Sequence, residues 1–440
     1  MADSQPTSRL PFSEQPLPRN YRWNWTFLFF ESALFTIATS LVNQTTVLPL
    51  LIERLSGSTV VVGIASGLFT GAWLLPQVFI AGAVSGLSRK MPVVRAGVWS
   101  SRSFFFVGGL FLWYVGARRP TVTLAAVLAS VVLFYALDAV AAVPWFDVMS
   151  KCIPPNRRGR LFGFSEVLGG ICGIGTGMVV RYVLGSTSPW TFPANFAVLF
   201  FGAAVIYQIG SFLLSLVREP PNEVAQDKRL TLRQVLKQMP GILTGDRGFR
   251  RLVLVRLATG FVGVASAFYV LHATQRMGLG TEASGYFASA QVVGALAAGL
   301  LTSVVQDHWG PLAHVRVMGV LAALPASIAL LIEPVSLLIG ARVFYLYLFL
   351  FFLLGLFAGS SSWPFFNYSL EYASEDKRPS YVGLLNTLGG FNMLAPALGG
   401  WVVKAFSYQA VFGLALGFAA LGLILSKGLP STRKADTGAE

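Results

Sequence analysis

Long uninterrupted runs of apolar residues are the feature that most constrains how this chain can fold. A helix that crosses a bilayer needs about 20 predominantly apolar residues, and we find twelve such runs in the 440-residue sequence. They cover residues 25–48, 60–84, 93–116, 121–146, 161–184, 196–217, 252–273, 284–305, 315–332, 335–357, 381–404 and 409–426. Because the runs lack the alternating polarity of barrel strands, they predict an all-α membrane protein with 12 transmembrane helices.

Composition excludes several other classes of protein. Charged residues make up 12% of the chain and hydrophobic residues 54%, whereas an average soluble domain is about 25% charged. The sequence therefore predicts neither a soluble enzyme nor a disordered protein. The only two cysteines, Cys152 and Cys172, form no CxxC motif, so neither a disulfide framework nor a metal site is expected. The polar first 20 residues lack the apolar core of a signal peptide, and we expect the first apolar run to be retained as a membrane helix.

The basic residues indicate how the chain is oriented in the membrane. Twelve spans place both termini on one side, and most of the 33 Lys and Arg residues lie in the segments on that side. Since Lys and Arg mark cytoplasmic loops, we expect cytoplasmic termini in a multi-pass cell-membrane protein. The net charge of +14 is then an orientation signal, and no nucleic-acid partner is expected.

The predicted spans and their orientation divide the chain into five segments. We expect a cytoplasmic tail (1–24), a six-helix bundle (25–217), a cytoplasmic linker (218–251), a second six-helix bundle (252–426) and a C-terminal tail (427–440). Within the linker, residues 230–239 place apolar side chains at helical spacing with basic residues between them. This pattern fits either a helix lying on the inner leaflet or a plain tether between the bundles.

A repeated motif indicates that the two bundles are duplicates. Pro144-Trp-Phe-Asp147 leads to an Arg-rich loop and then to Leu168-Gly-Gly170, and half a chain length later Pro364-Phe-Phe-Asn367 leads to Leu388-Gly-Gly390. Each window lies between the fourth and fifth predicted span of its half. Two halves related by an axis along the membrane normal would place the windows this way.

With this duplication the chain resembles the major facilitator superfamily of secondary transporters. Its loop between spans 2 and 3 runs from Gly82 to Lys90 and is similar to the family pattern G-x-x-x-D-R-x-G-R-[RK], with Gly86 at the aspartate position. The loop between spans 8 and 9 keeps Asp307 and Gly310. Span 11 contains the Gly- and Pro-rich stretch 390–400, similar to the family's span-5 motif, and its partner 169–177 is glycine-rich without proline. Span 4 lacks the arginine found in many proton-coupled members.

The resemblance implies two six-helix bundles that rock about a central site, exposing it to each side of the membrane in turn. Spans 5 and 11 would form contacts between the bundles, because small residues let helices approach closely in lipid. Generic packing within a bundle is the alternative use of the same glycines. The molecule is expected to be a monomer that contacts membrane lipids and needs no cofactor.

Charged residues inside the predicted spans are functional candidates, because burying a charge in hydrocarbon is costly. By position along the spans, all of these residues fall in the cytoplasmic half, and they suggest either a cytoplasmic gate that closes by ion pairing or a static structural network. One carboxylate is in excess and could carry a proton; Asp138 is the first candidate and Glu31 the second. The five gate candidates are Glu31, Arg102, Asp138, Glu166 and Arg256.

The middle and outer parts of the spans carry amide and aromatic side chains, which predict a pocket for an uncharged or amphipathic organic solute. Bonding between helices is the alternative role of such side chains. No catalytic motif is present, so we do not expect an enzyme. A non-transporting assembly factor or partner protein that kept this fold is the alternative function. The substrate-binding candidates are Asn43, Gln44, Trp73, Gln77, Tyr269, Gln291, Asn386 and Asn392.

Overall fold

The first half of the chain folds into one helical bundle. The computed structural model describes residues 17–84, 87–220, 241–361, 363–374 and 378–432, and in these ranges the chain is helical, without strands. The bundle is built from α1 (Tyr21–Leu41), α2 (Val47–Ser56), α3 (Thr59–Val84), α4 (Met91–Leu110) with the short continuation η1 (Phe111–Val115), α5 (Pro120–Cys152), α6 (Pro155–Leu184) and α7 (Ala194–Ser215).

The second half forms a matching bundle in which several helices are interrupted. Its elements are α9 (Arg247–Phe261), η2 (Val262–Ala265), α10 (Phe268–Gln275), α11 (Ala283–Ile339), η3 (Gly340–Arg342), α12 (Val343–Ser360), α13 (Pro364–Tyr372), α14 (Arg378–Gly389), η4 (Gly390–Leu394), α15 (Ala395–Ala405) and α16 (Tyr408–Ser426). The all-helical, two-bundle fold expected from the sequence is thereby confirmed.

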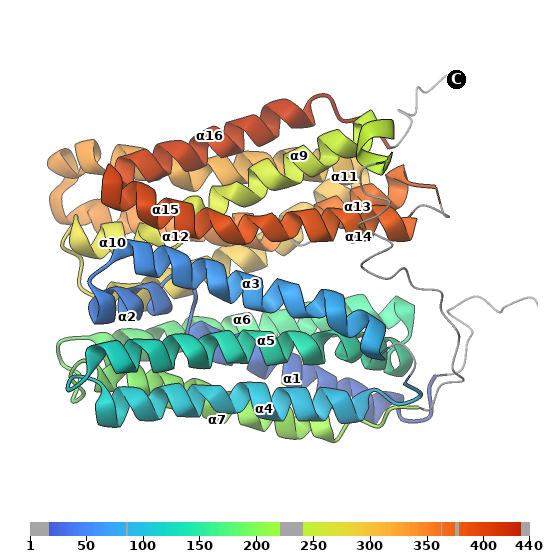
Figure 1. The fold of residues 1–440 in the computed structure, drawn as a ribbon, viewed down its shortest axis with the longest axis horizontal. Coiled ribbons are helices and arrows are strands. Elements are labelled where there is room, and N and C mark those ends of the chain that lie inside the picture. The colour runs from blue at the N-terminus through green and yellow to red at the C-terminus, as the bar shows by residue number, and fades with distance from the viewer. Residues whose placement is uncertain (1–16, 85–86, 221–240, 362, 375–377, 433–440) are drawn as a thin grey trace, which may run out of the picture.

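The two bundles lie side by side with their helices roughly parallel to one long direction (Figure 1). The start of α1, the end of α7, the start of α9 and the end of α16 all lie at one end of the molecule, which we call the terminal end. The short helices α2 and α10 lie at the opposite end, which we call the far end. Helices α3 and α6 of the first bundle contact α15 and α11 of the second.

Every apolar run found in the sequence overlaps a helix, but the helices differ in length and apolarity. By length and composition, seven helical stretches of the described residues could cross a membrane, and one of them, Ala283–Tyr372, contains three of the predicted runs. Helices α1 and α4 are not among the seven. Each carries a buried charged side chain, Glu31 in α1 and Arg102 in α4.

Two glycines set helix boundaries, and the second of these boundaries differs from the predicted one. Gly310 has φ 78° and bends α11 between the eighth and ninth runs. Gly340, with φ 55°, ends the second part of α11 after Ile339. Positive φ is accessible to glycine without the penalty that a Cβ brings. The predicted run 335–357 is therefore divided, and its helix α12 begins only at Val343.

Asp246 fixes the start of the second bundle at the terminal end, inside the segment predicted as linker. Its carboxylate caps α9 by accepting a hydrogen bond from the Phe249 N–H at 2.9 Å, and it accepts two more from the hydroxyls of Tyr372 at 2.7 Å and Tyr381 at 2.8 Å. Partial burial alone would raise the pKa of Asp246, but these hydrogen bonds outweigh it and lower the pKa. The tail residues 1–16 and 433–440 and the amphipathic stretch 230–239 lie outside the described residues.

Candidate functional site

A cavity of about 280 Å³ lies in the terminal half of the molecule, mainly within the first bundle. Its walls come from α1, α3, α4, α5, α6 and α7, and Trp363 adds a side chain from the second bundle. Six of the lining residues are aromatic and four are charged. The lining residues are Glu31, Ser32, Phe35, Thr36, Trp73, Val98, Arg102, Asp138, Ala141, Ala142, Trp145, Phe146, Phe162, Glu166, Leu214 and Trp363.

Three of the predicted gate residues meet in the wall of this cavity. The Arg102 guanidinium donates to Glu31 Oε1 at 2.7 Å, and its Nε lies 3.8 Å from Asp138 Oδ1. All three side chains are almost fully buried. A charge removed from water is tolerated only when it is paired and hydrogen-bonded, and α1, α4 and α5 bring these charges together from distant parts of the sequence.

Arg102 is held by further contacts that fix its position. It donates to the Tyr207 carbonyl and to Ser211 Oγ, both at 3.3 Å, and it lies 5.5 Å from the Phe35 ring centroid and 5.7 Å from that of Tyr207. Aromatic faces attract cations. Its Nε nevertheless has no hydrogen-bond partner in the described part of the chain. The guanidinium is therefore bound firmly to Glu31 and only loosely to Asp138.

The remaining two gate candidates lie apart from this cluster. Glu166 of α6 lines the same cavity with an exposed side chain, and no ion pair or hydrogen bond to it is found among the described residues. Arg256 lies in α9 of the second bundle, 3.4 Å from Asn386 Oδ1 and 5.4 Å from the Phe365 ring centroid. In this conformation the five charges therefore do not form one network across the two bundles.

A second group of charges joins the helices of the first bundle at the terminal end. Lys90, in the loop between spans 2 and 3, pairs with Asp147 of α5, and Lys151 pairs with Glu219 at 2.6 Å. Glu219 also accepts the Lys90 and Met91 N–H groups, both at 2.8 Å, at the start of α4. The loop is thus tied to a helix by Lys90, while Gly86, at the family's aspartate position, lies outside the described residues.

Asn43 and Gln291 contact each other across the two bundles. Gln291 Oε1 accepts a hydrogen bond from Thr45 Oγ1 at 2.8 Å and lies 3.5 Å from Asn43 Nδ2. Asn43 Oδ1 also accepts from the Thr45 N–H at 2.8 Å and so holds the turn before α2. Neighbouring Gln44 lies close to Tyr135 of α5. These amides make contacts within the protein, and Thr45 is a partner that the sequence did not single out.

Of the remaining substrate candidates, only Trp73 lines the cavity. Gln77 donates to the Trp73 carbonyl at 2.8 Å within its own helix, and Tyr269 is buried and stacked on Phe412 at 5.0 Å between ring centroids. Asn392 packs against Gly260 with a buried Oδ1 that has no hydrogen-bond partner in the described part of the chain, and Asn386 faces Arg256.

The bundles touch through glycines. A Cβ on Gly177 of α6 would overlap Gly285 O and Ser289 Oγ of α11, and a Cβ on Gly63 of α3 would overlap Pro396 O of α15. Thr59 Oγ1 adds a hydrogen bond to Gly400 O at 3.3 Å. Close helix approach through small residues therefore joins the bundles in their far half. The predicted contact of spans 5 and 11 takes a different form. Span 5 (α6) packs on span 8 (the first part of α11), and span 11 (α15) packs on span 2 (α3).

The cavity also contains aromatic side chains that sequence reasoning missed. Trp145 and Phe146 belong to the duplicated motif, and Trp363 directly precedes its second copy. The duplication was a signal for these positions, since it marked the terminal ends of spans 4 and 10, but it did not show which side of the helix faces the cavity.

Comparisons with known proteins give the same fold. A bacterial homologue of the iron transporter ferroportin, solved in an inward-facing state, superposes with a TM-score of 0.68 over 93% of this chain and 98% of its own, at 13% identity. The D-xylose–proton symporter gives 0.66 over 94% and 99%, at 13% identity. A bacterial ferroportin homologue in an outward-facing state gives 0.55 over 92% and 98%, at 13% identity.

The family itself is identified from sequence. No curated protein sequence was found to match the chain. The sequence profile of the Major Facilitator Superfamily matches residues 32–391, which is most of the chain and covers parts of both bundles. Its apolar helices make it a multi-pass membrane protein. The chain belongs to the major facilitator superfamily.

Proposed function

We propose that this protein carries a small organic, amphipathic solute across the cell membrane by alternating access. The observation that carries the proposal is the cavity, because it joins a buried charge cluster to six aromatic side chains. Charges inside membrane spans are costly and mark transport pathways. The sequence favours an uncharged or an amphipathic solute, and this mixed lining supports the amphipathic one.

We further propose that the conformation described here is inward-facing. The terminal end carries most of the Lys and Arg residues, and the positive-inside rule therefore supports a cytoplasmic position for it. The bundles touch in their far half, and the cavity lies in the terminal half. The TM-score of 0.68 with the inward-facing ferroportin homologue, against 0.55 with the outward-facing one, supports this assignment.

Closing the terminal end would bring the proposed gate together. Glu166 on the first bundle and Arg256 on the second have no oppositely charged partner among the described residues. We propose that they pair across the bundles in the outward-facing state, with the cluster of Glu31, Arg102 and Asp138 behind them. A rocking motion that exchanges far-end contacts for terminal-end ion pairs would alternate access to the cavity.

Asp138, and after it Glu31, are the proposed sites of proton coupling. Glu31 already has a close partner in Arg102, whereas Asp138 lies 3.3 Å from the Ser101 hydroxyl and 3.8 Å from the Arg102 Nε. The less paired carboxylate binds a proton more readily. Asp138→Asn should abolish transport driven by a pH gradient while solute exchange without a gradient persists.

The function is tested by a ligand screen followed by transport. Purified protein is screened for thermal stabilisation by organic solutes, and the hits are measured in proteoliposomes with and without a pH gradient. A stabilising solute that also shows counterflow supports the proposal. No ligand, together with one membrane protein that co-purifies stably, would contradict it and favour a non-transporting assembly factor or partner protein.

A further inference from the structure

The charges of the cavity do not balance. Its lining contains three carboxylates, Glu31, Asp138 and Glu166, and a single cationic side chain, Arg102. Arg102 makes its close ion pair with Glu31. The cavity wall therefore has two carboxylates without a strong partner among the described residues. Asp138 is buried, where an uncompensated charge is costly, and Glu166 is exposed to the cavity.

Asp138 is the carboxylate that points most directly to a missing partner. Its exposed fraction is only 6%, yet the one hydrogen bond to it from the described residues, donated by the Ser101 hydroxyl, reaches Oδ1 at 3.3 Å. In the described part of the chain no hydrogen bond or ion pair reaches Oδ2. The nearest cation is Arg102, whose own Nε is buried without a hydrogen-bond partner. The Asp138 carboxylate and the Arg102 guanidinium are thus buried close together without a hydrogen bond between them.

The rest of the wall suits a cation with an apolar body. Six aromatic side chains face the cavity, including Trp73, Trp145 and Trp363, and tryptophan faces bind cations best among the aromatic rings. Apart from the charged groups, the polar side chains of the lining are Ser32 and Thr36. The lining thus contains no amide, and carboxylates are its main hydrogen-bond acceptors.

From these observations we infer that the cavity binds an amphipathic organic cation, an inference that rests on the transport function proposed above. The cationic nitrogen lies between Asp138 and Glu166, and the apolar part packs against the tryptophan and phenylalanine rings. An anion is disfavoured because Arg102 is already engaged by Glu31. The other basic gate candidate, Arg256, is half-buried and is not among the lining residues.

Three small molecules of nearly the same shape separate charge from size. Benzyltrimethylammonium has a cationic nitrogen, neopentylbenzene has a neutral carbon at the same place, and phenylmethanesulfonate has an anionic group there. Binding of each is measured by calorimetry on the purified full-length protein. We expect the cation to bind at least about tenfold more tightly than either analogue, a difference typical of one carboxylate contact or cation–π contact.

Variants then locate the site. Glu166→Gln and Asp138→Asn should each weaken binding of benzyltrimethylammonium about tenfold and change that of neopentylbenzene by less than about twofold. Glu166 is exposed in the cavity, so its variant should fold normally even if Asp138→Asn does not. Glu282→Gln makes the same chemical change outside the cavity and should leave binding of all three molecules unchanged.

The outcomes separate the ligand class from the transport function. Equal or tighter binding of neopentylbenzene or phenylmethanesulfonate would overturn the inference, as would cation binding that Glu166→Gln leaves unchanged. In that case transport still stands if another solute shows counterflow in proteoliposomes. Selective, Glu166-dependent binding of the cation without counterflow would instead support the inference and contradict transport of this solute.

Discussion

Replacing Gly177 with alanine should push the protein away from the conformation described here. A Cβ at this position would overlap Gly285 O, a backbone atom of the opposite bundle, and would lie 3.2 Å from Ser289 Cβ. Ser289 cannot simply turn aside, because its hydroxyl donates to Ile174 O at 3.0 Å and to Gly285 O at 3.2 Å. The clash is relieved if α6 and α11 move apart.

The size of the effect follows from the cost of overpacking. Forcing one extra methyl group into a tight contact costs about 1–3 kcal/mol, which shifts a two-state equilibrium by about five- to hundredfold. Gly175 is the matched control, since it lies on the same helix and a Cβ there meets nothing within 4 Å. Gly175→Ala should therefore leave the equilibrium unchanged.

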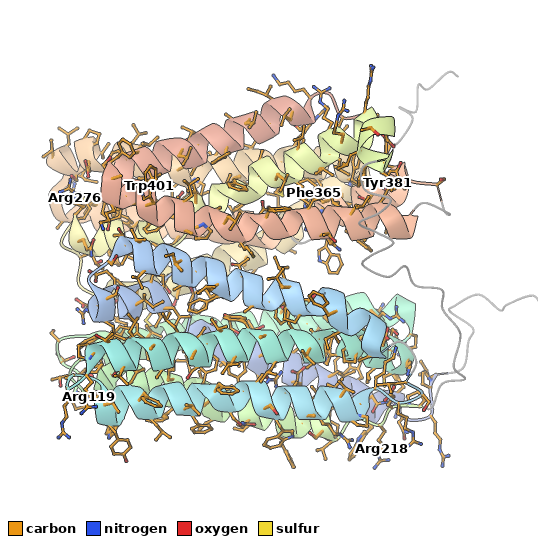
Figure 2. All side chains as sticks on the ribbon, viewed as in Figure 1. Arg119, Arg218, Arg276, Phe365, Tyr381 and Trp401 are labelled. Carbon is orange, nitrogen blue, oxygen red and sulfur yellow. The ribbon has the colours of Figure 1, made fainter. Side chains whose placement is uncertain are left out.

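Distances between spin labels report the shift. Arg119 and Arg276 are exposed, belong to different bundles, and lie at the far end (Figure 2). Each is replaced by a labelled cysteine in a background without Cys152 and Cys172. Double electron–electron resonance should show a longer far-end distance in Gly177→Ala and the original distance in Gly175→Ala. Identical distance distributions in both variants would refute the idea that this helix contact holds the far end closed.

Three further predictions concern individual contacts. Arg102→Ala leaves Glu31 buried without a cation and should lower stability by about 3–5 kcal/mol, measured by thermal unfolding in detergent, whereas an unchanged melting temperature would contradict the buried ion pair. Thr45→Val removes a hydrogen bond between the bundles and should favour the far-end-open state by about 1 kcal/mol, read from the same spin-label pair; an unchanged or shorter far-end distance would contradict it. Asp246 has a lowered pKa in the folded protein, so its contribution is present above the unfolded-state pKa and is lost as pH falls through the folded value. Acid unfolding should therefore become less steep in Asp246→Asn, and an unchanged pH profile would show that its hydrogen bonds contribute little.

Apolar runs and one duplicated motif were enough to predict the fold. Span length and continuous apolarity are properties of the local sequence, so each predicted run overlaps a helix. The boundary near residue 340 was wrong because it depends on a single backbone conformation, the positive φ of Gly340, which the apolar residues on both sides conceal. The family's Gly-rich pattern located contact surfaces but not which helix each one faces.

The candidate site was predicted less completely, for a physical reason. A charge inside an apolar run stands out in any sequence, and Glu31, Arg102 and Asp138 were found in this way and do lie together. An amide such as Asn43 or Gln291 stands out equally, but only the three-dimensional arrangement shows that these two face each other across the bundles. Trp145 and Trp363 were missed because an aromatic residue in a membrane span is ordinary.

Labelling of one cysteine inside the cavity tests alternating access most directly. Ala142 lines the cavity, and Ala142→Cys is made in a background without Cys152 and Cys172, then exposed to a membrane-impermeant maleimide in right-side-out and in inverted vesicles. We predict rapid labelling from the cytoplasmic side, slow labelling from the other side, and a reversal of this preference when Gly177→Ala is added. Labelling from one side only, at the same rate with and without Gly177→Ala, would contradict alternating access.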